Sequence, residues 1–337
     1  MARTRSVAAT EEPLPLSFGR AQVMGRPASY VEAGAGPAVV FLHGWGVGHR
    51  AYRDSLRQLA GNGLRVLAPS LPGFSGTAAL PRRESTLRGY AAWVVAFLET
   101  LEVKGAVLLV GHSFGGGVAT MTAVEARDRV RGLVLVNSVG GAAVTAGGDL
   151  VRPTARRLWD WGVHFAQDVR VPSQVFRVLP VVASDVVPNL VQAPRAFLRS
   201  AGLAWRADLT PELTTLGRRG LPVVIVWGRR DRLIGDESFR ALCDALGDPS
   251  PITVPGGHNW LLADPAHFGE VMTNVVAVAN RARWLRPIGA ARRWWRRRRS
   301  RLAGQLQRAV GRPLPVVTDR RRTGRGRPDR SAGPRGR

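Results

Sequence analysis

A single serine of the sequence stands in the glycine-rich stretch VGHSFGGG at residues 110–117. Gly111, Ser113 and Gly115 fit the spacing G-x-S-x-G, which holds a serine on a sharp turn between a strand and a helix. Glycine suits the flanking positions, because side chains there would collide inside so tight a turn. A glycine-rich turn without any catalytic role would also explain this stretch on its own, so further residues must decide.

A serine hydroxyl is a weak nucleophile, so it needs a base and an acid that orients the base. Asp231 follows the apolar run VVIVWG, and His258 follows ITVPGG. The order Ser113, Asp231, His258 is the order expected when each residue follows a later strand of the same sheet. Asp236 and Asp264 lie near enough in sequence to replace Asp231 as the acid. The combination predicts a catalytic triad for acyl transfer.

Acyl transfer also needs donors for the oxyanion that forms on the carbonyl. The stretch FLHGWG at 41–46 follows an apolar run and supplies a short loop. We predict that the backbone N–H groups of Trp45 and Phe114 form this oxyanion hole. The His43 side chain is expected to brace the loop.

The elements around these residues alternate between apolar runs and helical patterns. Strands are predicted at 26–34, 37–44, 64–71, 106–112, 130–138, 221–228 and 251–257. Helices are predicted at 49–63, 85–103, 114–130, 236–247 and 260–283, with Ser85 as the cap of the second. Strands that alternate with helices indicate an α/β fold with a mostly parallel central sheet flanked by helices.

The alternation stops at about residues 141–217, where the sequence is helical in pattern and includes Trp159, Trp161 and Trp205. Helices inserted there, after the strand predicted at 130–138, are expected to form a lid over the strand ends. The tryptophans favour an apolar pocket for an acyl or aromatic group.

Composition argues against several other classes of protein. Cys243 is the only cysteine, which excludes a disulfide framework and a cysteine-based metal site. Lys104 is the only lysine and no glycine-rich loop precedes it, so there is no Walker A loop; the spacing in HGWGVGH does not match a dinucleotide fingerprint. His164 and His267 are expected to be packing or surface residues. No cofactor and no metal are therefore expected.

The net charge of +25 is concentrated at the end of the chain, since residues 281–337 hold 20 arginines and two aspartates. Residues 284–337 are predicted to be an Arg-rich tail, with an amphipathic helix at 288–310 and disorder beyond. Arg292–Arg301, with Trp294 and Trp295, could adsorb to an anionic membrane surface. A solvated extension without a partner is the alternative, and binding to nucleic acid is less favoured.

The rest of the chain shows no targeting or membrane-spanning pattern. Residues 1–16 lack a secretory apolar region and are predicted to be flexible, and no apolar stretch reaches the length of about 18 residues that spans a bilayer. We therefore expect a cytoplasmic protein, with peripheral membrane association through the tail left open.

On these motifs the chain resembles the α/β-hydrolase family, in its capped, esterase- or lipase-like serine form, over residues 17–283. The resemblance implies that Ser113 is the nucleophile, His258 the general base and acid, and Asp231 the orienting carboxylate. The stretch SLPGFSGT at 70–77 resembles a family loop that usually has Asp, then Pro-Gly-x-Gly. Here Ser70 stands at the Asp position and Ser75 replaces the second glycine, which weakens any subfamily assignment.

The residue at the centre of the G-x-S-x-G turn, which is called the nucleophile elbow in this family, narrows the reaction that the resemblance implies. Epoxide hydrolases and haloalkane dehalogenases of the family have aspartate at the elbow, whereas Ser113 implies an acyl-serine intermediate. Hydrolysis of a carboxylic ester, such as a monoacylglycerol or another apolar acyl ester, is the leading expectation. Relatives with the same triad cleave carbon–carbon bonds of ring-fission products or catalyse perhydrolysis. A non-catalytic scaffold that uses the basic tail is the alternative from another class.

Overall fold

The computed structural model describes residues 14–141, 184–247, 249 and 251–284. Its centre is an eight-stranded sheet in the order β1-β2-β4-β3-β5-β6-β7-β8. The strands are β1 (Leu16–Val23), β2 (Arg26–Ala33), β3 (Ala38–Leu42), β4 (Arg65–Pro69), β5 (Val107–His112), β6 (Val130–Val136), β7 (Val223–Gly228) and β8 (Ile252–Val254). Strand β2 is antiparallel to β1 and β4, and all other neighbouring strands are parallel. The predicted fold class is confirmed.

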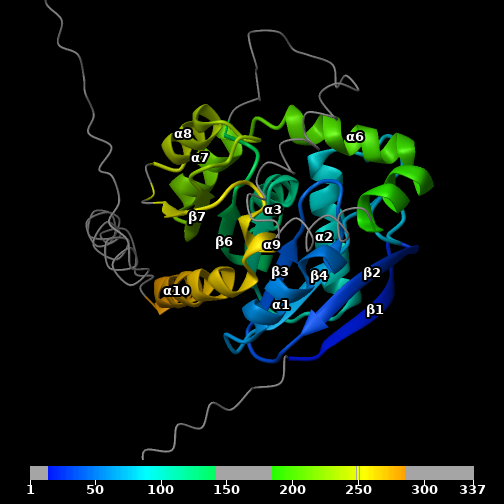
Figure 1. The fold of residues 1–337 in the computed structure, drawn as a ribbon, viewed down its shortest axis with the longest axis horizontal. Helices are drawn as coiled ribbons and strands as arrows, with labels where there is room; N and C mark the ends of the chain where they lie inside the picture. The colour runs from blue at the N-terminus through cyan, green and yellow to red at the C-terminus, as the bar shows by residue number, and fades with distance from the viewer. Residues whose placement is uncertain (1–13, 142–183, 248, 250, 285–337) are drawn as a thin grey trace, which may run out of the picture.

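Helices cover both faces of this sheet. They are α1 (Arg53–Ala60), α2 (Leu87–Thr100), α3 (Phe114–Glu125), α6 (Pro194–Trp205), α7 (Thr210–Arg219), α8 (Asp236–Ala245), α9 (Trp260–Ala263) and α10 (Pro265–Trp284), and a further helix spans 184–192. The 3-10 turns His49–Tyr52 and Arg127–Arg129 precede α1 and β6. Figure 1 shows α6 at the upper right of the molecule, α7 and α8 at the upper left, α1 in front of the sheet and α10 at the lower left.

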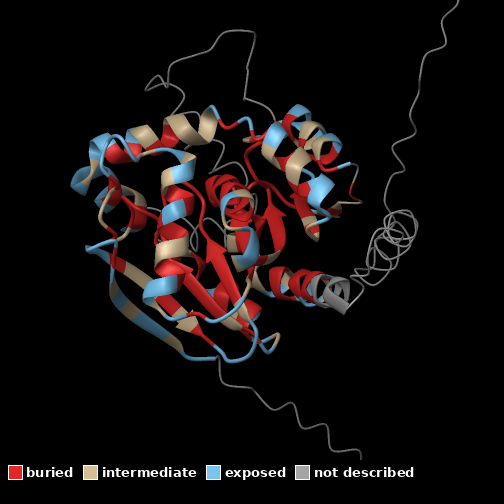
Figure 2. Cartoon of the chain, turned by 180° about the vertical axis from the view of Figure 1, so that it is seen from behind, coloured by how far each residue is buried: buried red, intermediate tan, exposed pale blue. Residues whose placement is uncertain are grey.

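The sheet is buried on both sides because its residues alternate between two apolar cores. Val107 and Leu109 of β5 pack with α2, α3, α7 and α8, whereas Leu108 and Val110 pack with α1, α9 and α10. Figure 2 shows the central strands as buried and the outer faces of the helices as exposed. Successive side chains of a strand point to opposite faces, which explains why the apolar runs are nearly continuous.

Strand β1 is the one strand that the sequence did not indicate. It pairs with β2 along its full length, and a tight turn at Met24 and Gly25, both with positive φ, joins the two. One face of this edge strand meets solvent, and Phe18 is 54% exposed. The strand therefore lacks the apolar alternation by which the other strands were identified.

The helix predicted at 114–130 ends at Glu125 and is followed by a 3-10 turn, and two further differences from the predicted helices have clear physical causes. The cap of α2 is Thr86, not Ser85, and the Thr86 hydroxyl accepts a hydrogen bond from Gly89 N at 3.1 Å. The helix predicted at 260–283 is two helices, α9 and α10, separated at Asp264. Pro265 follows this break, and a proline disfavours helical backbone in the residue before it.

The part of the predicted lid that the structure describes, residues 184–217, consists of the 184–192 helix, α6 and most of α7, joined by short non-helical segments. Residues 142–183, with Trp159, Trp161 and His164, lie outside the described residues, as do residues 1–13 and the tail from 285 onward. The lid boundaries and the role of the tail remain predictions. In the described part of the chain, no helix is both long and apolar enough to cross a membrane.

Candidate active site

Ser113 lies in the turn between β5 and α3, in a backbone conformation that non-glycine residues rarely adopt. Its φ is 53° and its ψ is −119°, and its side chain is buried. A Cβ on Gly111 would come within 2.5 Å of the Gly115 carbonyl oxygen, and a Cβ on Gly115 within 2.2 Å of the Leu42 carbonyl oxygen. The two motif glycines are therefore required by close backbone approach, as the sequence indicated.

Phe114 begins α3 directly after the serine. The first four N–H groups of a helix have no partner inside the helix, so the Phe114 N–H points out of its amino-terminal end. The helix dipole adds a positive potential at this end, which favours negative charge developing beside Ser113.

Asp231 and His258 meet at the carboxyl ends of β7 and β8. His258 Nδ1 donates a hydrogen bond to Asp231 Oδ2 at 2.8 Å, and both side chains are buried. The other carboxylate oxygen, Oδ1, accepts from Leu233 N at 2.9 Å and Ile234 N at 3.0 Å. The backbone loops approach closely, since a Cβ on Gly228 would lie 2.5 Å from the Gly257 carbonyl oxygen.

The surroundings of Asp231 hold it in the ionised form. Burial alone would raise the pKa of Asp231. The nearby His258, and hydrogen bonds from His258, Ile234 and Asn137, outweigh burial and lower this pKa below its ordinary value. The carboxylate is thus available to orient the imidazole and to stabilise an imidazolium.

Asn137, at the end of β6, was not identified from the sequence and ties this region together. Its Nδ2 donates to Asp231 Oδ2 at 2.6 Å, and its Oδ1 accepts from Gly228 N at 3.1 Å and from Trp260 Nε1 at 2.9 Å. The residue is fully buried and has a φ of 42°. The only sequence signal was its place, an asparagine at the carboxyl end of a buried strand.

A directed chain of hydrogen bonds joins the loop after β3 to the loop that carries His258. His112 Nε2 lies 3.0 Å from the His258 carbonyl oxygen, which can only accept, so Nε2 carries the proton. Burial, with a smaller contribution from His258, lowers the pKa of His112 to about 3, so the ring is neutral and Nδ1 accepts from the Tyr52 hydroxyl at 2.8 Å. The Tyr52 oxygen in turn accepts from Gly44 N at 3.1 Å.

The loop after β3 contacts the lid through Trp45. The Trp45 indole N–H lies 3.0 Å from the Phe197 carbonyl oxygen and 3.1 Å from Ser200 Oγ, both on α6. His43 braces the base of this loop, because its Nδ1 is 2.8 Å from the Gly44 carbonyl and its Nε2 accepts from Leu71 N at 2.8 Å. Burial lowers the pKa of His43 to about 3, so this imidazole is neutral.

The two unusual serines of the loop after β4 have distinct contacts. Ser70 Oγ lies 2.7 Å from His49 Nδ1 in a buried position. Burial, followed by the charge of Arg50, lowers the pKa of His49 to about 4, so a neutral hydroxyl suffices where an aspartate was expected. Ser75 has a φ of 41°, the left-handed conformation for which glycine is the usual residue.

A small apolar cavity opens at Ser113. Its volume is about 30 Å³, and it is lined by Trp45, Ser113, Val139, Ala201, Ala204, Trp205, Leu233 and Ile234. Ser113 and the predicted oxyanion residue Trp45 thus face one cavity, next to the Asp231 loop. A volume of this size holds one or two water molecules.

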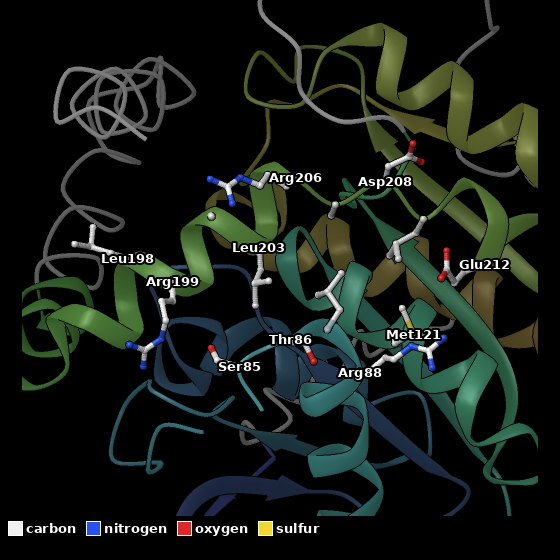
Figure 3. A pocket seen from close by; sticks show the side chains of 14 residues that line it. Ser85, Thr86, Arg88, Met121, Leu198, Arg199, Leu203, Arg206, Asp208 and Glu212 are labelled. Carbon is white, nitrogen blue, oxygen red and sulfur yellow. The ribbon is translucent and has the colours of Figure 1, made fainter. Parts of the chain in front are cut away.

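A larger groove of about 650 Å³ lies on the other side of α6 and contains none of the predicted site residues. Its wall includes Arg88, Arg199 and Arg206, but Figure 3 shows these side chains extending in different directions. They do not converge on one point, so the groove offers no focused anion site.

The remaining candidates lie apart from this centre. Asp236 is exposed at the start of α8, and Asp264 is exposed and accepts a hydrogen bond from His267 N at 3.0 Å. Neither has the contact with His258 that Asp231 has. Cys243 is buried on α8. Among the described residues, no group of three His, Cys, Asp or Glu side chains could hold a metal ion.

Comparisons with known proteins agree with this geometry. A sequence profile described as the alpha/beta hydrolase family matches residues 39–269. The 2-hydroxymuconate semialdehyde hydrolase of Pseudomonas sp. strain CF600 is 31% identical over 268 residues, which cover 74% of this chain and 90% of that protein. A protein of Mycobacterium phage D29 with the provisional name of non-heme haloperoxidase is 28% identical over 258 residues, or 73% of this chain and 88% of the phage protein.

Solved structures share the fold. A thermophilic esterase from Thermogutta terrifontis superposes with a TM-score of 0.63 at 20% sequence identity, covering 78% of this chain and 99% of the esterase. At this identity the likeness concerns the fold alone. The sequence match over residues 39–269 is what decides membership: the chain belongs to the α/β-hydrolase family, which implies hydrolase activity.

Proposed function

We propose that this chain is a serine hydrolase that cleaves a carboxylic ester through an acyl-serine intermediate. The observations that carry the proposal are the buried 2.8 Å hydrogen bond between His258 Nδ1 and Asp231 Oδ2, and a serine held at positive φ in a glycine-flanked turn. A buried histidine oriented by an ionised carboxylate is the arrangement that activates a serine hydroxyl.

The reaction proceeds in two steps. Ser113 Oγ attacks the carbonyl carbon while His258 takes the hydroxyl proton. Because Nδ1 is bound to Asp231, the proton moves on and off Nε2. The carbonyl oxygen becomes an oxyanion that accepts hydrogen bonds from the Phe114 and Trp45 N–H groups.

The collapse of this intermediate breaks the ester C–O bond, and His258 protonates the leaving alcohol. A water molecule then attacks the acyl-serine while His258 accepts its proton. This second step releases the carboxylic acid and restores Ser113. No cofactor is required at either step.

The cavity at Ser113 favours a short, apolar acyl group. Ala201, Ala204 and Trp205 of α6 form part of its wall, and about 30 Å³ leaves little room for a chain of several methylenes. A longer acyl group would need α6 to shift or Trp205 to change its rotamer. The proposed substrate class is therefore an ester of a short apolar acid.

The test is hydrolysis of p-nitrophenyl esters of increasing acyl length by the wild type and by Ser113→Ala. Loss of the nucleophile in a comparable serine hydrolase costs on the order of 10⁶ in turnover. Wild-type activity that is lost in Ser113→Ala, together with fluorophosphonate labelling of Ser113, supports the proposal. Equal and negligible turnover in both proteins, without labelling, refutes it.

Carbon–carbon hydrolysis is the second candidate, and one comparison favours it. The relative from Pseudomonas sp. strain CF600 is named 2-hydroxymuconate semialdehyde hydrolase. This reaction would be selected if the wild type does not hydrolyse esters but is labelled by a fluorophosphonate. The absorbance of such a ring-fission product should then decrease when the wild type is added.

A further inference from the structure

Two buried polar residues of the 184–192 helix reach the loop that follows β3, residues 43–48, which we call the oxyanion loop. Asp185 Oδ2 accepts a hydrogen bond from Gly48 N at 2.9 Å, and Asn189 Nδ2 donates to the Gly46 carbonyl at 3.0 Å. Only 5% and 2% of these two residues are exposed. Residues four apart lie on one face of a helix, so a single face of this helix binds both Gly46 and Gly48.

Asn189 also binds a second loop. Its Oδ1 accepts a hydrogen bond from Ser75 N at 2.7 Å, while its Nδ2 is engaged by Gly46. The amide is therefore used at both ends, as a donor to one loop and an acceptor from the other. Since Ser75 itself has a positive φ, this contact holds a strained turn against the oxyanion loop.

Asp185 is a buried carboxyl group that faces the end of the oxyanion loop. Burial raises the pKa of Asp185 above its ordinary value, while hydrogen bonds from Gly48 N and the Ala51 backbone, and the charges of Arg50 and Arg53, act in the opposite direction. These partners lie at the end of the oxyanion loop or directly after it. The side chain thus anchors the loop where the chain turns toward α1.

The lid binds the oxyanion loop at a third residue as well. The Trp45 indole N–H contacts Phe197 and Ser200 of α6, and the two rings of Trp45 and Phe197 lie 4.3 Å apart. Three of the four residues from Trp45 to Gly48 are thus attached to lid helices. Gly46, the middle residue of the three, has a φ of 91°.

We propose that Asp185 and Asn189 are positioning residues of the oxyanion hole, which fix Gly46 and Gly48 so that the Trp45 N–H faces the reacting carbonyl oxygen. This inference rests on the proposed function, because it takes the Trp45 N–H as an oxyanion donor. A displacement of about 1 Å at such a group can cost on the order of 10² in rate. The lid therefore contributes to the rate of the reaction as well as to the shape of the pocket.

The decisive variant is Asn189→Asp in the full chain. It keeps the size of the side chain and the acceptor for Ser75 N, but it replaces the donor to the Gly46 carbonyl with a second acceptor. We expect kcat for p-nitrophenyl acetate to fall about 10- to 100-fold while KM stays within about twofold. A trifluoromethyl ketone, which forms an oxyanion adduct with the serine, should bind more weakly by a similar factor.

Gln192→Ala is the matched control, since it removes an exposed side-chain amide from the same helix. It should leave kcat and the affinity for the ketone unchanged. Asp185→Asn retains an acceptor for Gly48 N and should keep more activity than Asp185→Ala. This second pair decides the question if Asn189→Asp does not fold.

Hydrogen exchange of the amides at 44–48 provides a readout that needs no substrate. Faster exchange there in Asn189→Asp than in Gln192→Ala, with the fall in kcat, supports the positioning role. A folded Asn189→Asp with wild-type kcat, or with unchanged exchange, overturns it while the proposed function stands. If the wild type shows neither ester turnover nor fluorophosphonate labelling, the proposed function fails. In that case, equal exchange rates of the amides at 44–48 in Asn189→Asp and Gln192→Ala also reject the positioning role.

Discussion

The acid–base pair and the oxyanion loop are held in place by different parts of the molecule. Asp231 and His258 are fixed by residues at the strand ends, above all Asn137, and by backbone N–H groups of their own loops. The oxyanion loop is fixed by Asp185 and Asn189 of the lid, together with α6. His258 is therefore positioned by the core of the fold, whereas the oxyanion loop depends on helices inserted between β6 and β7.

One chain of contacts connects these two regions. Tyr52 binds Gly44 of the oxyanion loop, and His112 binds both Tyr52 and the carbonyl of His258. All of these groups are buried, and each donor points to a single acceptor. The link passes through His112, the residue directly before Ser113. It fixes the backbone at His258 relative to the oxyanion loop.

The largest predicted effect on turnover is expected at Asp231, in the acid–base pair that the strand ends hold in place. Asp231→Asn keeps the size of the side chain but removes the charge that orients and stabilises the His258 imidazole. We expect kcat to fall on the order of 10⁴-fold, as in other triads that lose this carboxylate. Asp236→Asn, at the exposed start of α8, should retain wild-type turnover. Full activity in Asp231→Asn, measured with a p-nitrophenyl ester, would refute the assignment of the acid.

The catalytic residues predicted from the sequence share one property. Ser113, Asp231 and His258 each follow an apolar strand within a short glycine-containing segment, so local pattern was enough to propose them. The same reasoning placed most of the strands, because a strand covered on both faces is an uninterrupted apolar run. Strand β1 has one exposed face and a mixed sequence, and for this reason it gave no such signal.

The supporting residues could not be found in this way. Asn137 meets Asp231 across 94 positions, Asp185 meets Gly48 across 137, and His112 meets His258 across 146. Asn137 and Asp185 stand in segments without a motif, whereas His112 lies inside the serine motif, and only the tertiary fold gives each of the three its partner. Sequence pattern thus indicates residues that belong to a motif or to a known order along the chain, while the residues that orient them are found only through long-range contacts.

The next prediction concerns the acyl-chain specificity of the cavity, which α6 of the lid helps to form, as distinct from the rate of the reaction. Trp205→Ala should enlarge the cavity at Ser113 and shift the optimum toward longer acyl chains. Each methylene accommodated in an apolar pocket is worth about 1 kcal/mol or more, so the ratio of kcat/KM for hexanoate to that for acetate should rise about tenfold or more. Leu198→Ala is the control, because Leu198 is exposed on α6 and lines the other groove. An unchanged chain-length profile in Trp205→Ala would remove α6 from the acyl site.

A smaller effect is expected where the two regions are linked. Tyr52→Phe leaves the Gly44 N–H and His112 Nδ1 without their buried partner, which costs about 1–3 kcal/mol of stability. We expect kcat to fall by no more than about tenfold, since both regions keep their other supports. Tyr30→Phe, on half-buried β2, should change neither quantity. Urea unfolding and ester turnover measure both effects, and a Tyr52→Phe protein identical to the wild type would show that the link is not needed.

The smallest effect concerns the decrease in the free energy of unfolding at acid pH. The folded pKa of Asp231 is lowered, so its contribution to the free energy of unfolding is present above the unfolded pKa of about 3.9 and is lost as pH falls through the folded value. Asn137→Gly accommodates the positive φ but removes one hydrogen bond that lowers this pKa. The folded pKa then rises toward the unfolded one, and the loss of stability between pH 6 and pH 3 becomes smaller.

The difference should be a fraction of one pKa unit, or less than about 1 kcal/mol. It is measured by urea unfolding of the wild type and Asn137→Gly across this pH range, with Asn62→Gly, at the end of α1, as a control for the glycine itself. An overall loss of stability that is the same at every pH would mean that Asn137 supports only the backbone. A shallower pH dependence in Asn137→Gly alone would instead mean that the end of β6 tunes the charge on Asp231, so the core sets the electrostatics of the base as well as its position.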